Sequence, residues 1–309
     1  MEIFVQVLLL ALGFVMLVKG ADWFVDGAAS IAAKFGIPQL VIGLTIVAMG
    51  TSAPEAAVSI SAAFSGNADI TVGNIVGSNI LNILIILGLS AVITPLAVAK
   101  STVKLEIPFM IIITGVFMLL GIDGIMGWVD GLILTALFIT YLAYLFVQAM
   151  KNKGQDEGND IKEMKVPKAL AYTVLGIVVI VLGSRFAVNA ASFIAKAIGL
   201  SERFIGLTIV ALGTSLPELF TSVAAARKHN ADIAIGNIVG SNIFNILFVV
   251  GLSALIVPVP FIKNFMFDTA IAVAAAVLLF LCCFKNRRLN RRAGIIMLLG
   301  YAAYFAVIL

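Results

Sequence analysis

Residues 42–55 read IGLTIVAMGTSAPE, and residues 205–218 read IGLTIVALGTSLPE. Each stretch is an apolar run that closes with a glycine, two hydroxyl residues, a proline and a glutamate. A charged side chain at bilayer depth costs about 2.5–3.5 kcal/mol or more, and proline removes a helix hydrogen bond. So costly a pattern, repeated at an offset of 163 residues (from 42 to 205), indicates that both copies have a function.

The similarity extends beyond these two stretches. GNIVGSNILNIL at 73–84 matches GNIVGSNIFNIL at 236–247, and 36 of the 54 positions in 42–95 are identical to 205–258 without a gap. Chance does not produce such a match, so the chain carries an internal duplication. We predict a first half at 1–150 with its motif at 42–95, and a second half at 167–309 with its motif at 205–258. Residues 151–166 form the polar linker between them.

Composition places the whole chain in a membrane. Hydrophobic residues make up 62% of its 309 positions and charged residues 12%, whereas soluble domains have about 45–50% and about 25%. A spanning helix needs about 20 predominantly apolar residues. We therefore predict an all-α polytopic membrane protein with ten transmembrane helices at 3–21, 38–64, 69–93, 105–121, 127–150, 167–196, 203–227, 232–256, 266–284 and 293–309. The helices at 3–21 and 167–196 are expected to continue into the amphipathic residues that follow them.

Five spans in each half make the two halves inverted repeats, because the second half enters the membrane from the opposite side. Inverted repeats with broken helices that meet at the midplane are a recurring design of secondary transporters. Lys and Arg placement agrees: fifteen of these residues fall in the predicted inner loops and three in the outer loops, a strong positive-inside bias. Both termini are therefore expected outside and the linker in the cytoplasm.

Polar side chains share one face of the second predicted span. Thr51, Glu55 and Ser59 are four residues apart, with Ser52 beside them. Pro54 is expected to leave the backbone oxygens at 47–50 without helical partners, which membranes tolerate only inside protein or beside a watery cavity. The second half supplies the same set, which consists of Thr214, Ser215, Glu218 and Ser222, with its break at Pro217.

The third predicted span repeats this arrangement with neutral groups. Asn74, Ser78 and Asn82 lie on one face, and their counterparts are Asn237, Ser241 and Asn245. Glycines four residues apart beside them, at 73, 77, 236 and 240, offer surfaces for close helix approach. Carboxylates, hydroxyls and amide carbonyls are hard oxygen ligands, and no thiol, thioether or imidazole joins them. The set favours sodium or calcium over zinc or copper.

Structural explanations compete with this interpretation. The prolines can be ordinary kinks, the hydroxyls can bond to nearby carbonyls, and the asparagines can link helices. The glutamates fit such explanations poorly, because an intramembrane carboxylate has to find a partner. Asp69 and Asp232 are better explained as helix caps. The duplication does not keep the charge of Asp22 and Asp26, so these two are interpreted as interfacial.

Several functional classes are disfavoured. His229 is the single histidine, so catalysis or zinc binding by several histidines is excluded. Cys282 and Cys283 are adjacent in an apolar run and are interpreted as packing residues. An intramembrane protease is disfavoured because neither a Gly-x-Gly-Asp nor a Gly-x-Ser-Gly motif is present. A passive channel fits inverted repeats with broken helices less well than alternating access. We expect no enzyme, no cofactor, no nucleic-acid partner and no obligatory protein partner.

GTSAPE and GTSLPE, followed by GNIVGSNILNI and GNIVGSNIFNI, resemble the two signature repeats of the calcium/cation antiporter superfamily, specifically its prokaryotic sodium/calcium exchangers. The resemblance covers the whole predicted ten-span layout. It implies a core of the second, third, seventh and eighth spans, against which the first and sixth slide. It also implies alternating access in a prokaryotic plasma membrane, with sodium entering as calcium is expelled.

The resemblance also implies ligand sets. Calcium would be bound by Glu55, Glu218, Thr51 and Thr214. Sodium would be bound by Ser52, Ser215, Ser78, Ser241, Ala48, Ala211 and the same two glutamates. Asn82 and Asn245 would occupy the central polar positions, and the absence of an acid at Asn245 argues against potassium coupling. The linker is far too short for the regulatory domain of animal members.

Charge arithmetic agrees with an exchanger, because two carboxylates can neutralise one calcium ion or two sodium ions in a medium that penalises net charge. More than two sodium ions per calcium would make transport respond to voltage. The alternative is proton/calcium antiport, with protons in place of sodium on the glutamates. That branch typically begins its signature with Gly-Asn, whereas this chain has Gly-Thr-Ser; the hydroxyls favour sodium without deciding the question.

Overall fold

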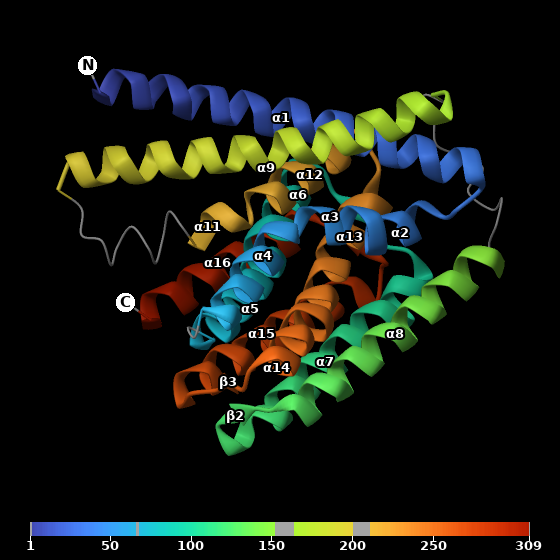
Figure 1. Ribbon diagram of the computed structural model, residues 1–309. Coiled ribbons are helices and arrows are strands. Elements are labelled where there is room, and N and C mark those ends of the chain that lie inside the picture. Colours follow the sequence, from blue (N-terminus) through green and yellow to red (C-terminus); the bar gives the residue numbers. More distant parts are fainter. Residues whose placement is uncertain (1, 66–67, 152–163, 200–210, 309) are drawn as a thin grey trace.

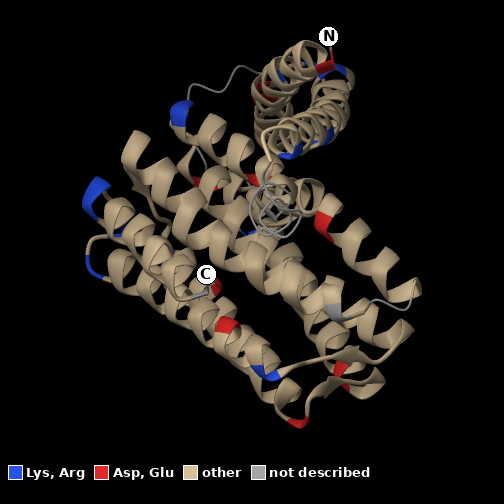
Figure 2. Ribbon diagram, turned by 90° about the vertical axis from the view of Figure 1, so that its left-hand side faces the viewer, with Lys and Arg blue, Asp and Glu red and all other residues tan. Residues whose placement is uncertain are grey.

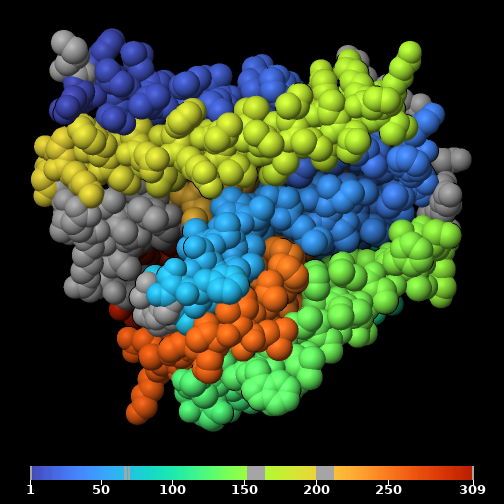
Figure 3. All heavy atoms as spheres, viewed as in Figure 1, coloured from blue at the N-terminus to red at the C-terminus, as the bar shows by residue number. Residues whose placement is uncertain are grey.

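A computed structural model of the protein describes residues 2–65, 68–151, 164–199 and 211–308. Two long helices, α1 (Glu2–Phe35) and α9 (Val166–Ala197), lie side by side across one side of a bundle made by the remaining helices (Figure 1). In the space-filling view they form a continuous layer over that side (Figure 3). The predicted extension of the first helix is confirmed, since α1 continues to Phe35 without a break.

Glycines spaced seven residues apart hold α1 and α9 together. A Cβ on Gly20 would lie 2.9 Å from the backbone nitrogen of Ile180 and 3.0 Å from the carbonyl oxygen of Gly176. A Cβ on Gly13 would lie 2.8 Å from the carbonyl oxygen of Gly183. The two backbones are therefore in direct contact, as small residues allow in membrane helices. Gly13 and Gly20 correspond to Gly176 and Gly183 at the 163-residue offset.

The second predicted span, 38–64, is a broken helix. It consists of α2 (Gln39–Ile42), a π-helical segment η1 (Gly43–Val47), α3 (Ala48–Thr51) and α4 (Ala53–Phe64). The two parts are bent by 49° at Ser52, whose ψ of 6° leaves the helical region. Pro54 lies in the first turn of α4, where its missing N–H costs nothing. The same break recurs between α11 (Ala211–Thr214) and α12 (Leu216–Arg227), at Ser215.

Two further interrupted helices form the centre of the bundle. One consists of α5 (Asp69–Leu81), π-helical η2 (Asn82–Leu87) and α6 (Gly88–Ile93). The other consists of α13 (Ala231–Phe244), π-helical η6 (Asn245–Val250) and α14 (Gly251–Ile256). η2 and η6, like α6 and α14, have bounds that differ by 163 residues. Most of both helices is buried, whereas the outer helices expose apolar side chains such as Phe146 and Leu281.

The glycines predicted to allow close helix approach do so where their partner is described. A Cβ on Gly236 would lie 3.0 Å from the Cα of Gly43, and a Cβ on Gly240 would lie 2.7 Å from the carbonyl oxygen of Leu44. α13 therefore packs directly on η1 and α3. The counterpart of this surface at 206–210 lies outside the described residues.

The outer layer comprises the helices that follow each centre, together with the short strands between them. In the first half these are β1 (Leu96–Ala97), π-helical η3 (Thr102–Glu106), α7 (Ile107–Leu120), 3₁₀-helical η4 (Gly121–Asp123), β2 (Ile125–Met126) and α8 (Trp128–Lys151). In the second half they are β3 (Val259–Pro260), α15 (Lys263–Phe284), β4 (Arg288–Leu289) and α16 (Arg291–Ile308).

The short strands pair between the halves. β1 is antiparallel to β4, with Leu96 opposite Leu289, and β2 is antiparallel to β3, with Met126 opposite Val259. The 163-residue offset relates the two pairs reciprocally: the first-half residue of each pair corresponds to the second-half residue of the other, since 96 plus 163 is 259 and 126 plus 163 is 289. The two halves thus contact each other through reciprocal surfaces, as the subunits of a two-fold dimer do.

The described residues do not confirm the predicted number of ten spans. Seven described helices are long and apolar enough to cross a membrane, or eight if the bent pair Gln39–Thr51 and Ala53–Phe64 is one span. α16 is not among them, and the predicted span 203–227 begins outside the described residues. Most Lys and Arg residues lie at helix ends, and the lengths between are largely uncharged (Figure 2). The fold is that of an all-helical, multi-pass membrane protein.

Candidate functional site

The two glutamates of the repeated motif lie at equivalent helix starts in the middle of the bundle. Glu55 is in the first turn of α4 and Glu218 in the first turn of α12, each directly after its proline. Both side chains are buried, with exposed fractions of 1% and 0%. A helix N-terminus carries a partial positive charge, which favours a carboxylate there. Each helix break therefore places a carboxylate where the local backbone stabilises it.

Hydroxyl groups connect each glutamate to the other half of the chain. The Ser52 Oγ donates to Glu218 Oε1 at 2.7 Å, and the Ser215 Oγ donates to Glu55 Oε1 at 3.3 Å. The Ser78 Oγ lies at the limit of hydrogen bonding, 3.5 Å from the same Glu55 oxygen. Three of the four predicted serines, two from the first half and one from the second, thus meet around the carboxylates. They form one site rather than two.

Asparagines on the central helices fix the first turns of α4 and α12. The Asn74 Nδ2 donates to the Ser59 Oγ at 3.0 Å and to the Glu55 carbonyl oxygen at 3.3 Å. Asn237 repeats these bonds with the Ser222 Oγ at 2.9 Å and the Glu218 carbonyl oxygen at 3.4 Å. Its own Oδ1 accepts from the Thr51 Oγ1 at 2.9 Å. These amides hold the backbone that carries the glutamates.

A second set of asparagines joins the two central helices, and the sequence pattern did not single out two of them. Asn79 and Asn242 each donate to the other's carbonyl oxygen, at 3.2 and 3.1 Å. Asn82 Nδ2 donates to Asn242 Oδ1 at 2.9 Å, and Asn245 Nδ2 donates to Asn79 Oδ1 at 3.1 Å. All four side chains are buried. The recurrence of Asn79 and Asn242 at the 163-residue offset was the available signal.

The backbone at the breaks corrects one prediction. The Ala48 carbonyl keeps its helical partner, the Ser52 N–H at 3.0 Å. The prediction that Pro54 leaves this carbonyl without a helical partner is therefore wrong. It also accepts from the Ser241 Oγ at 3.3 Å and from the Thr51 Oγ1 at 3.2 Å. The reason is that the helix breaks at Ser52 itself, whose N–H still donates to the carbonyl four residues before it.

In the second half, a freed carbonyl has found a donor on another helix. Pro217 has no N–H to offer to the Gly213 carbonyl, which instead accepts from the Ser184 Oγ of α9 at 2.7 Å. Ser184 corresponds to Ala21 in the first half, so α1 has no such hydroxyl for Gly50. The remaining predicted backbone ligand, Ala211, begins α11.

Four buried oxygens at this site have no hydrogen-bond donor among the described residues. They are Oε2 of Glu55, Oε2 of Glu218, Oδ1 of Asn82 and Oδ1 of Asn245. A buried acceptor without a partner costs about 1–3 kcal/mol, and more if it is charged. The two carboxylates also repel each other, and no described Lys, Arg or His pairs with either. The arrangement lacks positive charge, and its free atoms are all oxygen ligands suited to sodium or calcium.

The acids and cysteines that the sequence did not assign to the site lie elsewhere. Asp232 lies in the first turn of α13, where an acid complements the helix dipole, and the N-cap side chain of this helix is that of Asn230. Asp69 begins α5. Cys282 and Cys283 are both free thiols.

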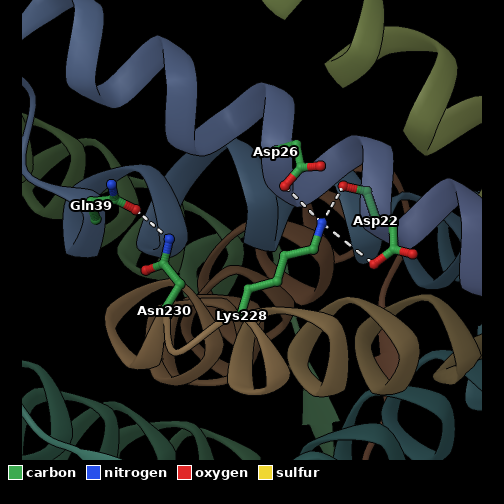
Figure 4. Close-up of polar contacts among 5 residues, drawn as sticks. All are labelled: Asp22, Asp26, Gln39, Lys228 and Asn230. Carbon is green, nitrogen blue, oxygen red and sulfur yellow. Dashed lines mark hydrogen bonds and ion pairs between the residues drawn. The ribbon is translucent and has the colours of Figure 1, made fainter. Parts of the chain in front are cut away.

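Asp22 and Asp26 of α1 hold the side chain of Lys228, at the end of α12, between them. Its Nζ lies 3.4 Å from Asp22 Oδ1 and 2.7 Å from Asp26 Oδ1 (Figure 4). All three side chains are partly exposed. Beside them, Asn230 donates to the Gln39 side chain. The ion pairs link α1 to the helix that carries Glu218.

A further buried acid, Glu106, lies away from the central site. The Tyr144 hydroxyl donates to its Oε1 at 2.8 Å, between η3 and α8. The sequence pattern did not single out this pair, because Glu106 has no acidic counterpart at residue 269. It therefore serves as an independent example of a buried carboxylate in this fold.

Comparison with known proteins relates the whole chain to a family of membrane exchangers. The family described as "Sodium/calcium exchanger protein" matches residues 5–147 and 168–309. The sodium/calcium exchanger MaX1 of Methanosarcina acetivorans is 32% identical over 344 residues, which cover 98% of each chain. The inner membrane protein YrbG of Escherichia coli is 34% identical over 315 residues, which cover 97% of this chain and 95% of YrbG.

The fold is also similar to a solved structure. The sodium-calcium exchanger NCX_Mj, soaked without sodium and calcium, matches with a TM-score of 0.87 and 35% identity. The match covers 99% of this chain and 100% of the other. The same exchanger soaked with 2.5 mM sodium and 10 mM strontium matches with a TM-score of 0.86. Both central helices and both broken helices fall within these matches.

Proposed function

The chain belongs to the sodium/calcium exchanger protein family, and on that premise we propose that it exchanges sodium ions for calcium ions across a cell membrane. The observation that carries the proposal is the set of four donorless oxygens on Glu55, Glu218, Asn82 and Asn245. Two come from each half, and all are buried. A bound cation supplies the positive charge that this set lacks.

The two carboxylates explain why the ions compete. Two negative charges are neutralised by one calcium ion or by two sodium ions, and uncompensated charge is costly in a buried site. We assign calcium to Glu55, Glu218, Thr51 and Thr214. We assign sodium to the same glutamates with the hydroxyls and carbonyls around them, on Ser52, Ser215, Ser78, Ser241, Ala48 and Ala211. Asn82 and Asn245 complete the centre.

The transport cycle follows from the two-fold relation of the halves. We propose ten spans in two inverted repeats, bounded as predicted at 1–150 and 167–309, with both ends of the chain outside. α1 and α9 contact each other through backbone and lie across one side of the bundle that holds the site, so their movement as a pair would open the site alternately to each side. Potassium is not required, because Asn245 is uncharged and so supplies no negative charge for a potassium ion to balance.

Transport into liposomes tests the function. Purified protein is reconstituted in vesicles loaded with sodium, and uptake of calcium is followed after dilution into sodium-free medium. An outward sodium gradient should drive uptake, and an equal potassium gradient should not. Uptake driven by an outward proton gradient but not by sodium would replace this proposal with proton/calcium antiport, in which protons occupy Glu55 and Glu218.

A further inference from the structure

A groove of about 270 Å³ lies between the beginning of α7 and the end of α15. Its lining has two chemical characters. Lys100, Lys104 and Arg287 lie at the helix ends, whereas Phe280, Phe284 and Pro108 continue along the two helices toward their middle. Phe284 exposes 64% of its surface. The groove is therefore basic at one end and apolar along its length.

The basic side chains of the groove have no acidic partner within the described residues. Described ion pairs involve Lys228 only, and Lys100, Lys104 and Arg287 are all exposed. Glu106, which is near them in sequence, is buried and bonded to Tyr144. Three unpaired cations around one groove repel each other and favour an anion.

The backbone at Arg287 adds an independent observation. Arg287 has a φ of 47°, in the left-handed region where glycine or asparagine is the usual residue. Its N–H bonds to the Cys283 carbonyl at 2.8 Å and its carbonyl accepts from the Val98 N–H at 2.9 Å. A long cationic side chain is thus held at a costly conformation directly beside the β1–β4 pair. These two backbone bonds fix the position of Arg287 at the end of the groove.

We infer that this groove binds an anionic phospholipid, with the phosphodiester headgroup on Lys100, Lys104 and Arg287 and an acyl chain along Phe280 and Phe284. The order of the lining matches the order of a lipid molecule, charged at the membrane surface and apolar below it. Basic pockets between membrane helices bind anionic headgroups in this way. The Lys and Arg bias assigns this end of the helices to the cytoplasmic leaflet, where such lipids carry a negative surface potential. The inference does not depend on which ions are exchanged.

Binding of defined lipids to the full-length protein in detergent tests the site. Phosphatidylglycerol and phosphatidylcholine with the same acyl chains are titrated, and bound lipids are counted by native mass spectrometry together with the midpoint of thermal unfolding. Phosphatidylglycerol should bind saturably and raise the midpoint, and phosphatidylcholine should not. Each cation removed as Lys100→Gln, Lys104→Gln or Arg287→Gln should weaken binding by about fivefold.

The matched control removes the same charge elsewhere at this end of the molecule. Lys285, Arg288 and Arg291 are exposed and do not line the groove, so the triple glutamine variant at these positions should bind phosphatidylglycerol like the parent. Equal losses in the groove and control variants would overturn the inference. So would saturation of the groove by glycerol phosphate at the same concentration, because the apolar part would then contribute nothing. The control is compared with the triple variant Lys100→Gln, Lys104→Gln, Arg287→Gln; if that variant does not fold, the Lys100→Gln, Lys104→Gln double variant makes the same comparison.

Discussion

Single residues at the site act across the two halves. Glu218 accepts from Ser52, and Glu55 accepts from Ser215, so each carboxylate is oriented by a hydroxyl from the opposite repeat. A change in one repeat therefore alters the ligand set contributed by the other. Ion binding at this centre should behave as one cooperative unit, with equivalent substitutions in the two halves having similar effects.

Glu55→Gln and Glu218→Gln should each reduce sodium-driven calcium uptake by more than a hundredfold. Glutamine keeps a bonding oxygen in place but removes one of the two charges, and leaving a buried charge unbalanced costs about 3–5 kcal/mol. Uptake into liposomes measures the effect, together with the rise in unfolding midpoint that calcium gives the parent. Glu106→Gln is the control, since it removes a buried carboxylate away from the site. Normal uptake in either site variant would contradict a shared site.

Asn79→Ala should destabilise the protein by about 1–3 kcal/mol. The substitution removes the partner of the Asn245 amide and one of the two bonds that join Asn79 to Asn242, and it leaves buried groups unsatisfied. Asn242→Ala should have a matching effect because its bonds are the reciprocal ones. Chemical or thermal unfolding in detergent measures both. A large difference between the two variants would refute the equivalence of the halves.

Helices α1 and α9 behave as one element, because their glycines bring the two backbones into contact. Gly20→Leu should lower stability by about 1–3 kcal/mol and slow transport, since any side chain there meets the backbone of α9. Val18→Leu adds volume two residues away on a side chain that is 41% exposed, so it should change neither quantity. Measurements of unfolding and of uptake rate distinguish the Gly20→Leu variant from the Val18→Leu variant. Equal effects would mean that the contact is not tight in the membrane.

The Lys228 ion pairs connect this two-helix element to α12 at one end only. The offset places Ser65 opposite Lys228, and Arg185 and Asn189 opposite Asp22 and Asp26, so the first half has no equivalent. Partly exposed pairs contribute about 0–1 kcal/mol. Lys228→Gln should therefore speed backbone hydrogen exchange at 26–35 by at most about fivefold, an effect that weakens in high salt. The double swap Lys228→Asp with Asp26→Lys should restore protection; failure to do so would show that the pairs do not hold α1.

On the scale of the whole molecule, exchange of more than two sodium ions per calcium would move net charge. Calcium uptake against three outward sodium ions carries one positive charge out of the vesicle, so an inside-positive potential should accelerate it and an inside-negative one should slow it. The driving force changes by about 2.3 kcal/mol per charge for each 100 mV. Uptake at clamped potentials measures this. Rates that ignore the potential would indicate electroneutral exchange of two for one.

The sequence predicted the parts of this fold that repeat along the chain. The offset of 163 residues identified both broken helices, and the four-residue spacing placed Thr51, Glu55 and Ser59 on one buried face. It did not identify contacts between helices that depend on their rotation and approach, such as Ser184 with Gly213 or β1 with β4. The prediction that the Ala48 carbonyl loses its helical partner was wrong for a local reason. A proline removes the helical N–H donor only of the carbonyl oxygen four residues before it. Asn79 and Asn242 each follow directly after a serine of the predicted polar face. Their role became evident only from the packing of the two central helices.

The pairing of strands between the two halves has a consequence for how such a chain arises. β1 and β2 of the first half find their partners only in β4 and β3 of the second, with matching registers. A polypeptide carrying one half alone would present both strands unpaired and half of the central oxygens without their counterparts. It could complete both only by meeting a second copy of itself in the reciprocal arrangement that the two halves show here. The gene for the joined chain thus encodes, in one reading frame, what would otherwise be a self-complementary pair of molecules.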